Sequence, residues 1–262
     1  MISIPLDQLN AWIAAFIYPV ARILGFAASA TILNSAGMPA RVRLILGLAL
    51  AVGITPSLPP IPAIVPTSGP GILTLINQIL IGIGMGVSMR IVFSGIEMAG
   101  QNISNQMGLG FATFYDPLST SQTAVISNFS TLLASLLFLS LNGHLVYFAT
   151  LAESFRVIPI SPVPLGVHSW KSLFISGRDI FLIGTILSLP VITALLITNL
   201  SLGVLNKAAP QLNLFAIGFP ITLSIGFVGF ALSLNYMAAP LEHFFNEAIV
   251  RMLNFALSAK TN

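Results

Sequence analysis

The sequence predicts an all-α, membrane-associated protein whose helical hairpins are interrupted by proline and glycine. Of the 262 residues, 56% are apolar and 6% are charged, whereas a soluble domain has about 25% charged residues. The charges are also clustered, since the stretches 44–89, 117–152 and 208–241 contain none. Each stretch exceeds the ~20 residues that a helix needs to cross ~30 Å of hydrocarbon. These observations argue against a soluble enzyme and indicate a multi-pass helical protein.

Six apolar segments are expected to be helices, with approximate bounds 9–33, 42–58, 71–98, 121–152, 173–206 and 211–238. The first follows no basic stretch and contains Arg22, so it is expected to remain as a helix rather than to be removed as a signal peptide. Gly82 and Gly86 in the third form a G-x-x-x-G step, which predicts close helix packing. Pro190 and Pro220, in the fifth and sixth segments, are expected to kink their helices.

Two proline-rich connectors organise the chain. The connector 59–71 has five prolines and two glycines in 13 residues, so it cannot be helical throughout. A second connector at 159–164 divides the chain into residues 1–158 and 159–262. We therefore expect a larger N-terminal part and a smaller C-terminal part.

The last stretch, 240–260, is expected to be an amphipathic helix and is a candidate partner contact, with lateral packing at the membrane surface as the alternative. Glu247 and Arg251 have the i,i+4 spacing that favours an ion pair. The apolar residues that share its other face are Leu241, Phe244, Phe245, Ala248, Met252, Phe255 and Ala256.

The basic residues do not give the helices an orientation. If all six segments cross the membrane from an outside N-terminus, two sets of similar size fall on opposite sides. The inside set is Arg41, Arg43, Arg90 and Lys207, and the outside set is Arg156, Lys171, Arg178, Arg251 and Lys260. Either some segments do not span the bilayer, or partner subunits rather than lipid fix their positions.

Signatures of catalysis are missing from the sequence. There is no cysteine, no G-x-S-x-G, Walker A or H-E-x-x-H motif, and no run of five like charges that would suit a nucleic acid. His144, His168 and His243 are scattered, with no acidic residue at metal-ligand spacing. We therefore predict no enzyme activity, no catalytic residue, no metal, no cofactor and no nucleic-acid partner.

The polar stretch 97–115 is the candidate functional region. It contains clustered amides, then Gly108 and Gly110, then an aromatic cluster. Amides at this density are costly in hydrocarbon unless they line water or pair with one another. The stretch is either a pore-facing loop whose apolar tip obstructs a passage, or an ordinary loop outside the membrane. Its polar candidates, pore-facing or buried, are Glu97, Gln101, Asn102, Asn105 and Gln106.

Glu97 itself has two interpretations. It is an acidic residue inside the third apolar segment, which suits a proton or cation site. The alternative, which we favour, is a buried carboxylate that hydrogen-bonds to a partner or to Gln101, because no second acid or histidine shares its face.

Three blocks of the sequence resemble the FliR family of flagellar export-gate proteins and their injectisome relatives. They are MPARVRLILGLALA at 38–51, QMGLGFATFYDP at 106–117 and LPVITALLITNLSLGVLNKAAPQLNLFAIGFPITLSIG at 189–226. The resemblance covers essentially the whole chain, and the third block is highly specific. The motif residues expected to serve packing are Asn199, Pro210, Gln211, Asn213, Phe215, Gly218 and Pro220. The chain departs from the pattern at 30–36, which lacks an expected Ala-Pro-x-Phe.

The resemblance implies a structural and gating subunit of a type III export gate, without enzyme activity. Members assemble with P-type and Q-type subunits into a helical ring around a channel for unfolded flagellar proteins, and they contact a B-type switch subunit. It also implies a multi-pass protein of the bacterial inner membrane, in contact with lipid and part of the flagellar basal body. Residues 1–158 would correspond to a P-like half and residues 159–262 to a Q-like half.

The resemblance also favours the pore-facing interpretation of the polar stretch, because the family carries a plug loop at this place. The residues that correspond to it are Gly108, Leu109, Gly110, Phe111, Ala112, Thr113, Phe114 and Tyr115. The alternative function is a small-molecule secondary transporter, which broken helices and an amide cluster would suit. Against it stand the lack of an inverted repeat and of a clear pair of intramembrane acids for ion coupling.

Overall fold

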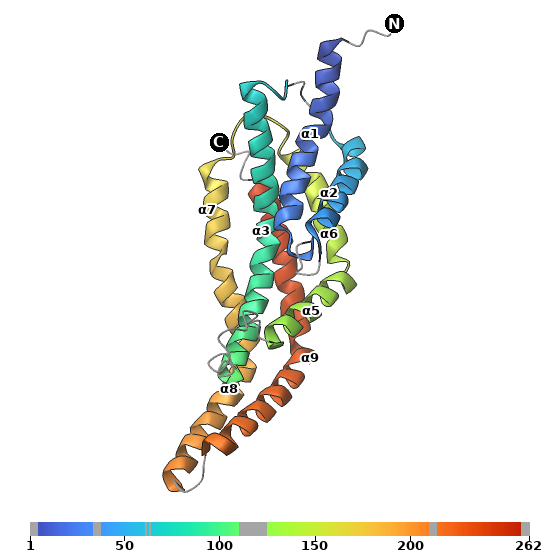
Figure 1. Ribbon diagram of the computed structural model, residues 1–262. Helices are drawn as coiled ribbons and strands as arrows, with labels where there is room; N and C mark the ends of the chain where they lie inside the picture. The colour runs from blue at the N-terminus through green and yellow to red at the C-terminus, as the bar shows by residue number, and fades with distance from the viewer. Residues whose placement is uncertain are drawn as a thin grey trace, which may run out of the picture. The chain divides into compact units, whose positions relative to one another are not determined.

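The computed structural model describes residues 5–33, 38–60, 62, 64–109, 125–209 and 214–257, and within these the regular structure is entirely helical (Figure 1). The all-α prediction is therefore confirmed. The α-helices are α1 (Leu6–Ser29), α2 (Ala40–Ile54), α3 (Gly69–Gln106), α5 (Val125–Ser140), α6 (Gly143–Val157), α7 (Val167–Ser176), α8 (Arg178–Ala208) and α9 (Leu214–Leu257), with short 3-10 turns at Thr31–Leu33 and Thr55–Ser57.

The described helices are long and apolar enough for a multi-pass membrane protein. Five stretches have the length and hydropathy of a membrane span, and the number rises to six if α5 and α6 count as one broken span. The stretches are Gln8–Ser29, Ala40–Ser57, Gly69–Gln106, Val167–Ala208 and Ile217–Leu257. With α5 and α6 counted as one broken span, the number agrees with the six apolar segments expected from the sequence.

The helix ends differ from the expected segments in three places. The segment 121–152 is interrupted, because Asn142 has a φ of 56° and this left-handed conformation cannot continue a helix. The chain remains helical over residues 97–106, which belong to the polar stretch 97–115 that the sequence left open as a loop, so α3 ends within that stretch. The helix α9 continues through Pro240, so the amphipathic tail and the sixth segment form one helix of 44 residues.

The chain folds into two compact units. The first comprises Met1–Ile91, Asn142–Gly177 and Asn246–Asn262, and the second comprises Val92–Leu141 and Arg178–Phe245. The predicted division into residues 1–158 and 159–262 concerns similarity to two other subunits, whereas these units are defined by packing. It stays a prediction.

In the first unit, α1 packs closely against the N-terminal part of α3. A Cβ atom at Gly82 would lie 2.7 Å from the backbone nitrogen of Phe26, and one at Gly86 would lie 2.9 Å from the carbonyl oxygen of Phe26. Tyr147 of α6 is buried beside them, with its ring 4.5 Å from that of Phe26. The close packing predicted from the G-x-x-x-G step is confirmed.

In the second unit, α8 and α9 form the two arms of a hairpin, drawn in orange and red in Figure 1. The C-terminal part of α3 and the helix α5 belong to the same unit. Phe93 of α3, Phe138 of α5 and Phe245 of α9 pack ring against ring, with centroids 5.0–6.4 Å apart. This unit contains both flanks of the segment between α3 and α5.

Candidate functional site

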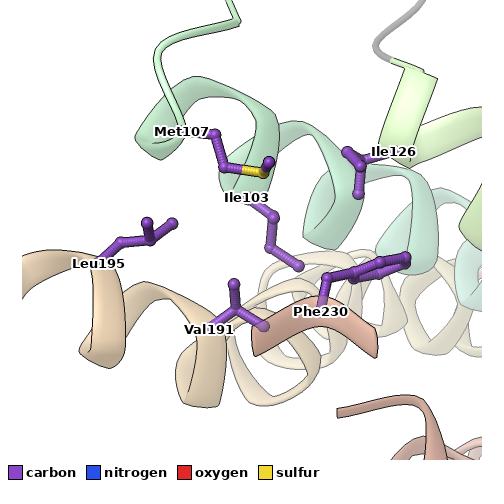
Figure 2. Packing of buried hydrophobic residues seen from close by; sticks show 6 residues of the cluster. All are labelled: Ile103, Met107, Ile126, Val191, Leu195 and Phe230. Carbon is purple, nitrogen blue, oxygen red and sulfur yellow. The ribbon is translucent and has the colours of Figure 1, made fainter. Parts of the chain in front are cut away.

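A small apolar cluster lies where α3 ends and α5 begins. Figure 2 shows its members pointing toward one another. They are Ile103 and Met107 from the α3 end, Ile126 from α5, Val191 and Leu195 from α8, and Phe230 from α9, each at most 5% exposed. The two ends of the chain segment between α3 and α5 are therefore held by one cluster, which we call the root cluster.

Met107 of the root cluster packs against Gly226 of α9. A Cβ atom at Gly226 would overlap Cγ of Met107 and would lie 2.8 Å from its Sδ. The hydroxyl of Thr222, one turn earlier on α9, lies 3.4 Å from the carbonyl oxygen of Met107 and donates to it. The last carbonyls of a helix have no partner within the helix, so Thr222 supplies a donor where α3 needs one.

The start of α5 lies equally close to α3. A Cβ atom at Gly100 would overlap Cα of Ser127 and would lie 2.7 Å from its backbone nitrogen. The hydroxyl of Ser127 donates to the carbonyl oxygen of Glu97 at 2.9 Å. A glycine and a hydroxyl thus bring the two backbones together at the start of α5.

Gly108 ends the helical conformation of α3. It has a φ of 85°, in the left-handed region that glycine adopts without strain and other residues adopt at a cost. Its N–H donates to the carbonyl oxygen of Asn105 at 3.1 Å. Leu109 follows and packs, half-buried, against the root cluster.

Residues 13–248 match the model of the family described as bacterial export proteins, family 1. The chain is similar to the flagellar biosynthetic protein FliR of Pectobacterium carotovorum subsp. carotovorum, with 41% identity over 245 residues and 92% of each chain covered. It is also similar to the FliR proteins of Escherichia coli strain K12, at 40% identity over 94% of each chain, and of Aquifex aeolicus, at 30% identity over 86% of this chain and 87% of the other.

The chain belongs to the FliR family of bacterial export proteins. The family resemblance inferred from the three sequence blocks is thereby confirmed.

The polar residues that the sequence singled out in this FliR-family chain lie along the last turns of α3. Glu97, Gln101 and Asn105, spaced four residues apart, are exposed, and the Gln101 amide donates to Oδ1 of Asn105 at 3.1 Å. Asn102 and Gln106 are half-buried. Glu97 is exposed on the isolated chain, so its burial against a partner subunit stays a prediction.

Of the eight residues that would form the family's plug, the structure describes Gly108 and Leu109, which lie at the root cluster. The remaining six lie outside the described residues: Gly110, Phe111, Ala112, Thr113, Phe114 and Tyr115. Their role as a plug stays a prediction.

The FliR-motif residues that the structure describes lie on α8 and α9, with Asn199 on α8 and Gly218 and Pro220 on α9. Asn199 and Pro220 are exposed, and a Cβ atom at Gly218 would lie 3.6 Å from Cδ1 of Leu202, an ordinary contact. Pro210, Gln211 and Asn213 lie outside the described residues, as does the side chain of Phe215. Asn199 and Pro220 are exposed on this chain, and the packing role expected for the motif stays a prediction.

The amphipathic tail packs its apolar face within this chain. All seven apolar residues named from the sequence are at most 7% exposed, and Trp170 of α7 packs its ring 5.5 Å from that of Phe255. The predicted ion pair is present, with Nη2 of Arg251 2.8 Å from Oε2 of Glu247. The polar face, which includes the exposed Glu242 and Asn246, is what the tail offers to a partner.

The first unit contains a buried guanidinium that was not predicted from the sequence. Arg22 of α1 is 0% exposed. Its Nε donates to Oε1 of Gln78 at 2.7 Å, Nη1 to the hydroxyl of Ser154 at 3.1 Å, and Nη2 to the carbonyl oxygen of Ile158 at 2.9 Å. Its Cζ lies 4.1 Å from the ring centre of Phe155, at cation–π distance.

The signal that could have revealed Arg22 is its position, as a single cation in the middle of an apolar helix. Such residues almost always face the interior of a bundle and have a polar partner there. The partners of Arg22 lie 56–136 residues away in sequence, so the cage itself could not be read from local spacing.

The described part of the chain offers no group of three or more histidine, cysteine, aspartate or glutamate residues that could hold a metal ion. The arrangement at the root cluster is one of apolar packing and backbone hydrogen bonds. It suits a mechanical role, in which the cluster fixes the two ends of one segment.

Proposed function

We propose that this protein is a structural and gating subunit of the flagellar type III protein export gate. It would form, with P-type and Q-type subunits, the channel through which unfolded flagellar proteins leave the cell. The observation that carries the proposal is the family match over residues 13–248, together with relatives named flagellar biosynthetic proteins that align along 92–94% of both chains at 40–41% identity.

Exposed apolar surface supports assembly with other subunits. In α2, only Gly47 and Ala51 are buried. The large apolar residues that this helix leaves exposed are Val42, Leu44, Ile45, Leu46 and Val52. Contiguous apolar surface of this kind needs cover, from lipid or from protein. Neighbouring subunits would also explain why the basic residues set no orientation, since protein contacts and not the bilayer would then place the helices.

The same proposal makes the segment that begins at Gly108 the plug of the channel. Its sequence combines glycine with the aromatic residues Phe111, Phe114 and Tyr115, and aromatic side chains fill a narrow passage while excluding water. The fixed ends at the root cluster support this role, because a plug must return to the same place after each substrate has passed.

The remaining parts of the proposal concern location and partners. A multi-pass protein of this family would lie in the bacterial inner membrane, within the flagellar basal body. Residues 1–158 would correspond to a P-like half and residues 159–262 to a Q-like half. The polar face of the amphipathic tail is the candidate contact for a B-type switch subunit.

Co-purification tests the assembly. A tagged copy of this chain, expressed at its native level and solubilised from membranes in mild detergent, should bring down P-type and Q-type gate subunits in fixed ratio. A control pull-down uses an unrelated tagged membrane protein of similar size. Recovery of the intact chain without either subunit would contradict the proposal.

Deletion of residues 110–115 tests the plug. The proposal predicts a membrane that conducts ions more readily, measured as conductance of cells that contain the whole export apparatus, with normal recovery of the gate subunits. A conductance no higher than that of the wild type, at normal recovery, would contradict the plug.

A further inference from the structure

We propose that a cavity in the first unit binds the phosphate group of an anionic phospholipid. The cavity has a volume of about 220 Å³ and is lined by the N-terminal part of α3, the end of α6 and the connector between α6 and α7. A single water needs only about 10–15 Å³ of cavity, so there is room for a larger group. The lining includes Gln78, Ile81, Ile158, Ser161, Val163 and Leu165.

The cavity runs from the interior of the first unit to its surface. Gln78 of α3 is 1% exposed, whereas Val163 of the connector is 71% exposed. The amide nitrogen of Asn77 donates to the carbonyl oxygen of Pro162 at 3.3 Å and so ties the connector to α3. A ligand can therefore enter beside Val163 and reach the buried amide of Gln78 without any opening of the fold.

Two hydrogen-bond donors of the lining have no partner in the described part of the chain. Oε1 of Gln78 accepts from Nε of Arg22 at 2.7 Å. The amide nitrogen of Gln78 donates to none of the described residues, and neither does the hydroxyl of Ser161. A donor held away from bulk water is costly to leave unpaired. Ligand oxygens that accept from both groups would remove this cost.

The positive charge of Arg22 lies directly behind this wall. Gln78 and Ile158, which line the cavity, both accept hydrogen bonds from its guanidinium, at 2.7 and 2.9 Å. Its other partners, the hydroxyl of Ser154 and the ring of Phe155, are neutral as well, so none of the described contacts of this charge is a carboxylate. Charges interact more strongly inside a protein than in water, so the cavity favours an anion over a neutral ligand.

The first unit as a whole is strongly basic. It holds eight of the ten lysine and arginine residues and three of the seven aspartate and glutamate residues, which gives it a formal net charge of +5. The second unit has a formal net charge of −2. An anionic ligand therefore suits the first unit by charge as well as by hydrogen bonding.

The surface next to the connector fits an amphiphile. Helix α7 begins two residues after Leu165, and Val167, Lys171 and Phe174 share one of its faces, at positions i, i+4 and i+7, and are exposed. Apolar side chains beside a cation suit acyl chains beside a charged headgroup. Because several helices of this chain are long and apolar enough to span a membrane, phospholipid is the anionic amphiphile that would surround it.

Opposite charges at Val163 test the ligand. The tagged chain is purified in mild detergent with the subunits that accompany it and is washed in micelles that contain equal amounts of phosphatidylglycerol and phosphatidylcholine. Retained lipid is measured by mass spectrometry per mole of chain. Val163→Asp should lower phosphatidylglycerol retention several-fold and Val163→Lys should raise it, with phosphatidylcholine unchanged, because charge at the entrance acts on the anionic lipid alone. Opposite effects at one exposed position cannot come from damage to the fold.

A pair of serine-to-leucine variants tests the place of binding. Ser161→Leu fills part of the cavity and removes one donor, so it should release the retained phosphatidylglycerol. Ser57→Leu puts the same side chain at an exposed position outside the cavity lining and should retain the wild-type amount. A loss from Ser57→Leu as large as that from Ser161→Leu would overturn the site.

Inorganic phosphate distinguishes a lipid from a free anion. An excess of inorganic phosphate at constant ionic strength should leave phosphatidylglycerol bound, because free phosphate lacks the acyl chains that contact the apolar lining. Displacement of the lipid by phosphate would instead assign the cavity to a free anion and overturn the proposal. Equal retention of the two lipids by the wild type, or wild-type retention in Val163→Asp and Ser161→Leu, would overturn it as well. If Ser161→Leu keeps its lipid but loses an accompanying subunit, the cavity belongs to a protein contact and the lipid site is wrong.

Discussion

A single guanidinium in an apolar bundle is stable only if the protein replaces the water that it loses. Around Arg22, three oxygens and one aromatic ring do so, and they come from α3, α6 and the residue that follows α6. Each hydrogen bond to a charged group contributes about 1.5–3 kcal/mol. The arginine thus specifies how α1 lies against α3 and α6 within the first unit.

Replacing Arg22 by methionine should destabilise the chain severely. The substitution leaves the amide of Gln78 and the carbonyl of Ile158 without their donor, and each buried polar group left unpaired costs about 1–3 kcal/mol. Lysine should not restore stability, because its ammonium lacks the planar fork that reaches three partners. The measurement is the thermal midpoint and the yield of the gate complex in detergent.

Arg156→Gln is the matched control for Arg22. Its side chain is 64% exposed and pairs with Glu153 at 3.3 Å, and an exposed pair of this kind is worth about 0–1 kcal/mol. A loss of yield as large as that of Arg22→Met would show that any change of charge is harmful, and would contradict a specific role for the buried cage.

The backbone conformation of Gly108 also leads to a specific prediction. At a φ of 85°, an alanine costs about 1–2 kcal/mol, whereas asparagine tolerates this region better than other non-glycine residues. If the segment that begins at Gly108 is the plug proposed above, Gly108→Ala should raise the ion conductance of cells with an intact apparatus, and Gly108→Asn should raise it less. Equal effects of the two variants would show that the left-handed turn does not control closure.

At the scale of the helix, the features predicted correctly from the sequence are those with a local, periodic pattern of residues. The amphipathic tail, its Glu247–Arg251 pair and the close packing at Gly82 and Gly86 all follow from spacings within two turns of helix. The break at Asn142 and the continuity of α9 through Pro240 were not anticipated. Both depend on neighbours distant in sequence, because tertiary packing decides whether a helix tolerates a proline or a left-handed residue.

The root cluster likewise depends on residues distant in sequence, so it could not be predicted from local patterns. The polar stretch and Gly108 were identified from composition, but the partners that hold Met107 come from α8 and α9, more than 80 residues later. No local pattern indicates which glycine of α9 receives Met107, since Gly226 and Gly229 have similar surroundings in the sequence.

The packing of α1 against α3 predicts a large effect at Gly82. A Cβ atom there would overlap the carbonyl oxygen of Arg22 and lie 2.7 Å from the nitrogen of Phe26. Both neighbours are backbone atoms, which cannot rotate away, and overpacking costs about 1–3 kcal/mol. Gly82→Ala should lower the thermal midpoint of the purified complex.

Gly53→Ala on α2 is expected to have the opposite effect on the thermal midpoint. Nothing lies within 4 Å of a Cβ atom at this position, and alanine stabilises a helix interior by about 0.5–1 kcal/mol relative to glycine. The thermal midpoint should stay the same or rise. A fall as large as that of Gly82→Ala would mean that glycine is needed on α2 for contacts outside this chain.

At the scale of the whole molecule, the distribution of burial predicts that the chain depends on partners. In the apolar window of Ala40–Ser57 only 11% is buried, whereas in Gly69–Gln106 the share is 67%. If lipid covers the apolar surface of α2, the stability of the chain should be the same in cells with and without the other gate subunits. Neighbouring subunits would instead stabilise the chain only when they are present, because a partner that binds the folded form shifts the folding equilibrium toward it.

Expression with and without P-type and Q-type subunits decides between these two kinds of cover. If subunits cover α2, the chain made alone should be degraded faster in pulse-chase measurements and should be cleaved by protease after extraction in detergent. Co-expression should protect it, and Ile45→Asn, at a position 63% exposed on α2, should reduce that protection by placing an amide in an apolar contact. A monodisperse, protease-resistant monomer obtained without partners would instead assign the exposed apolar surface to lipid.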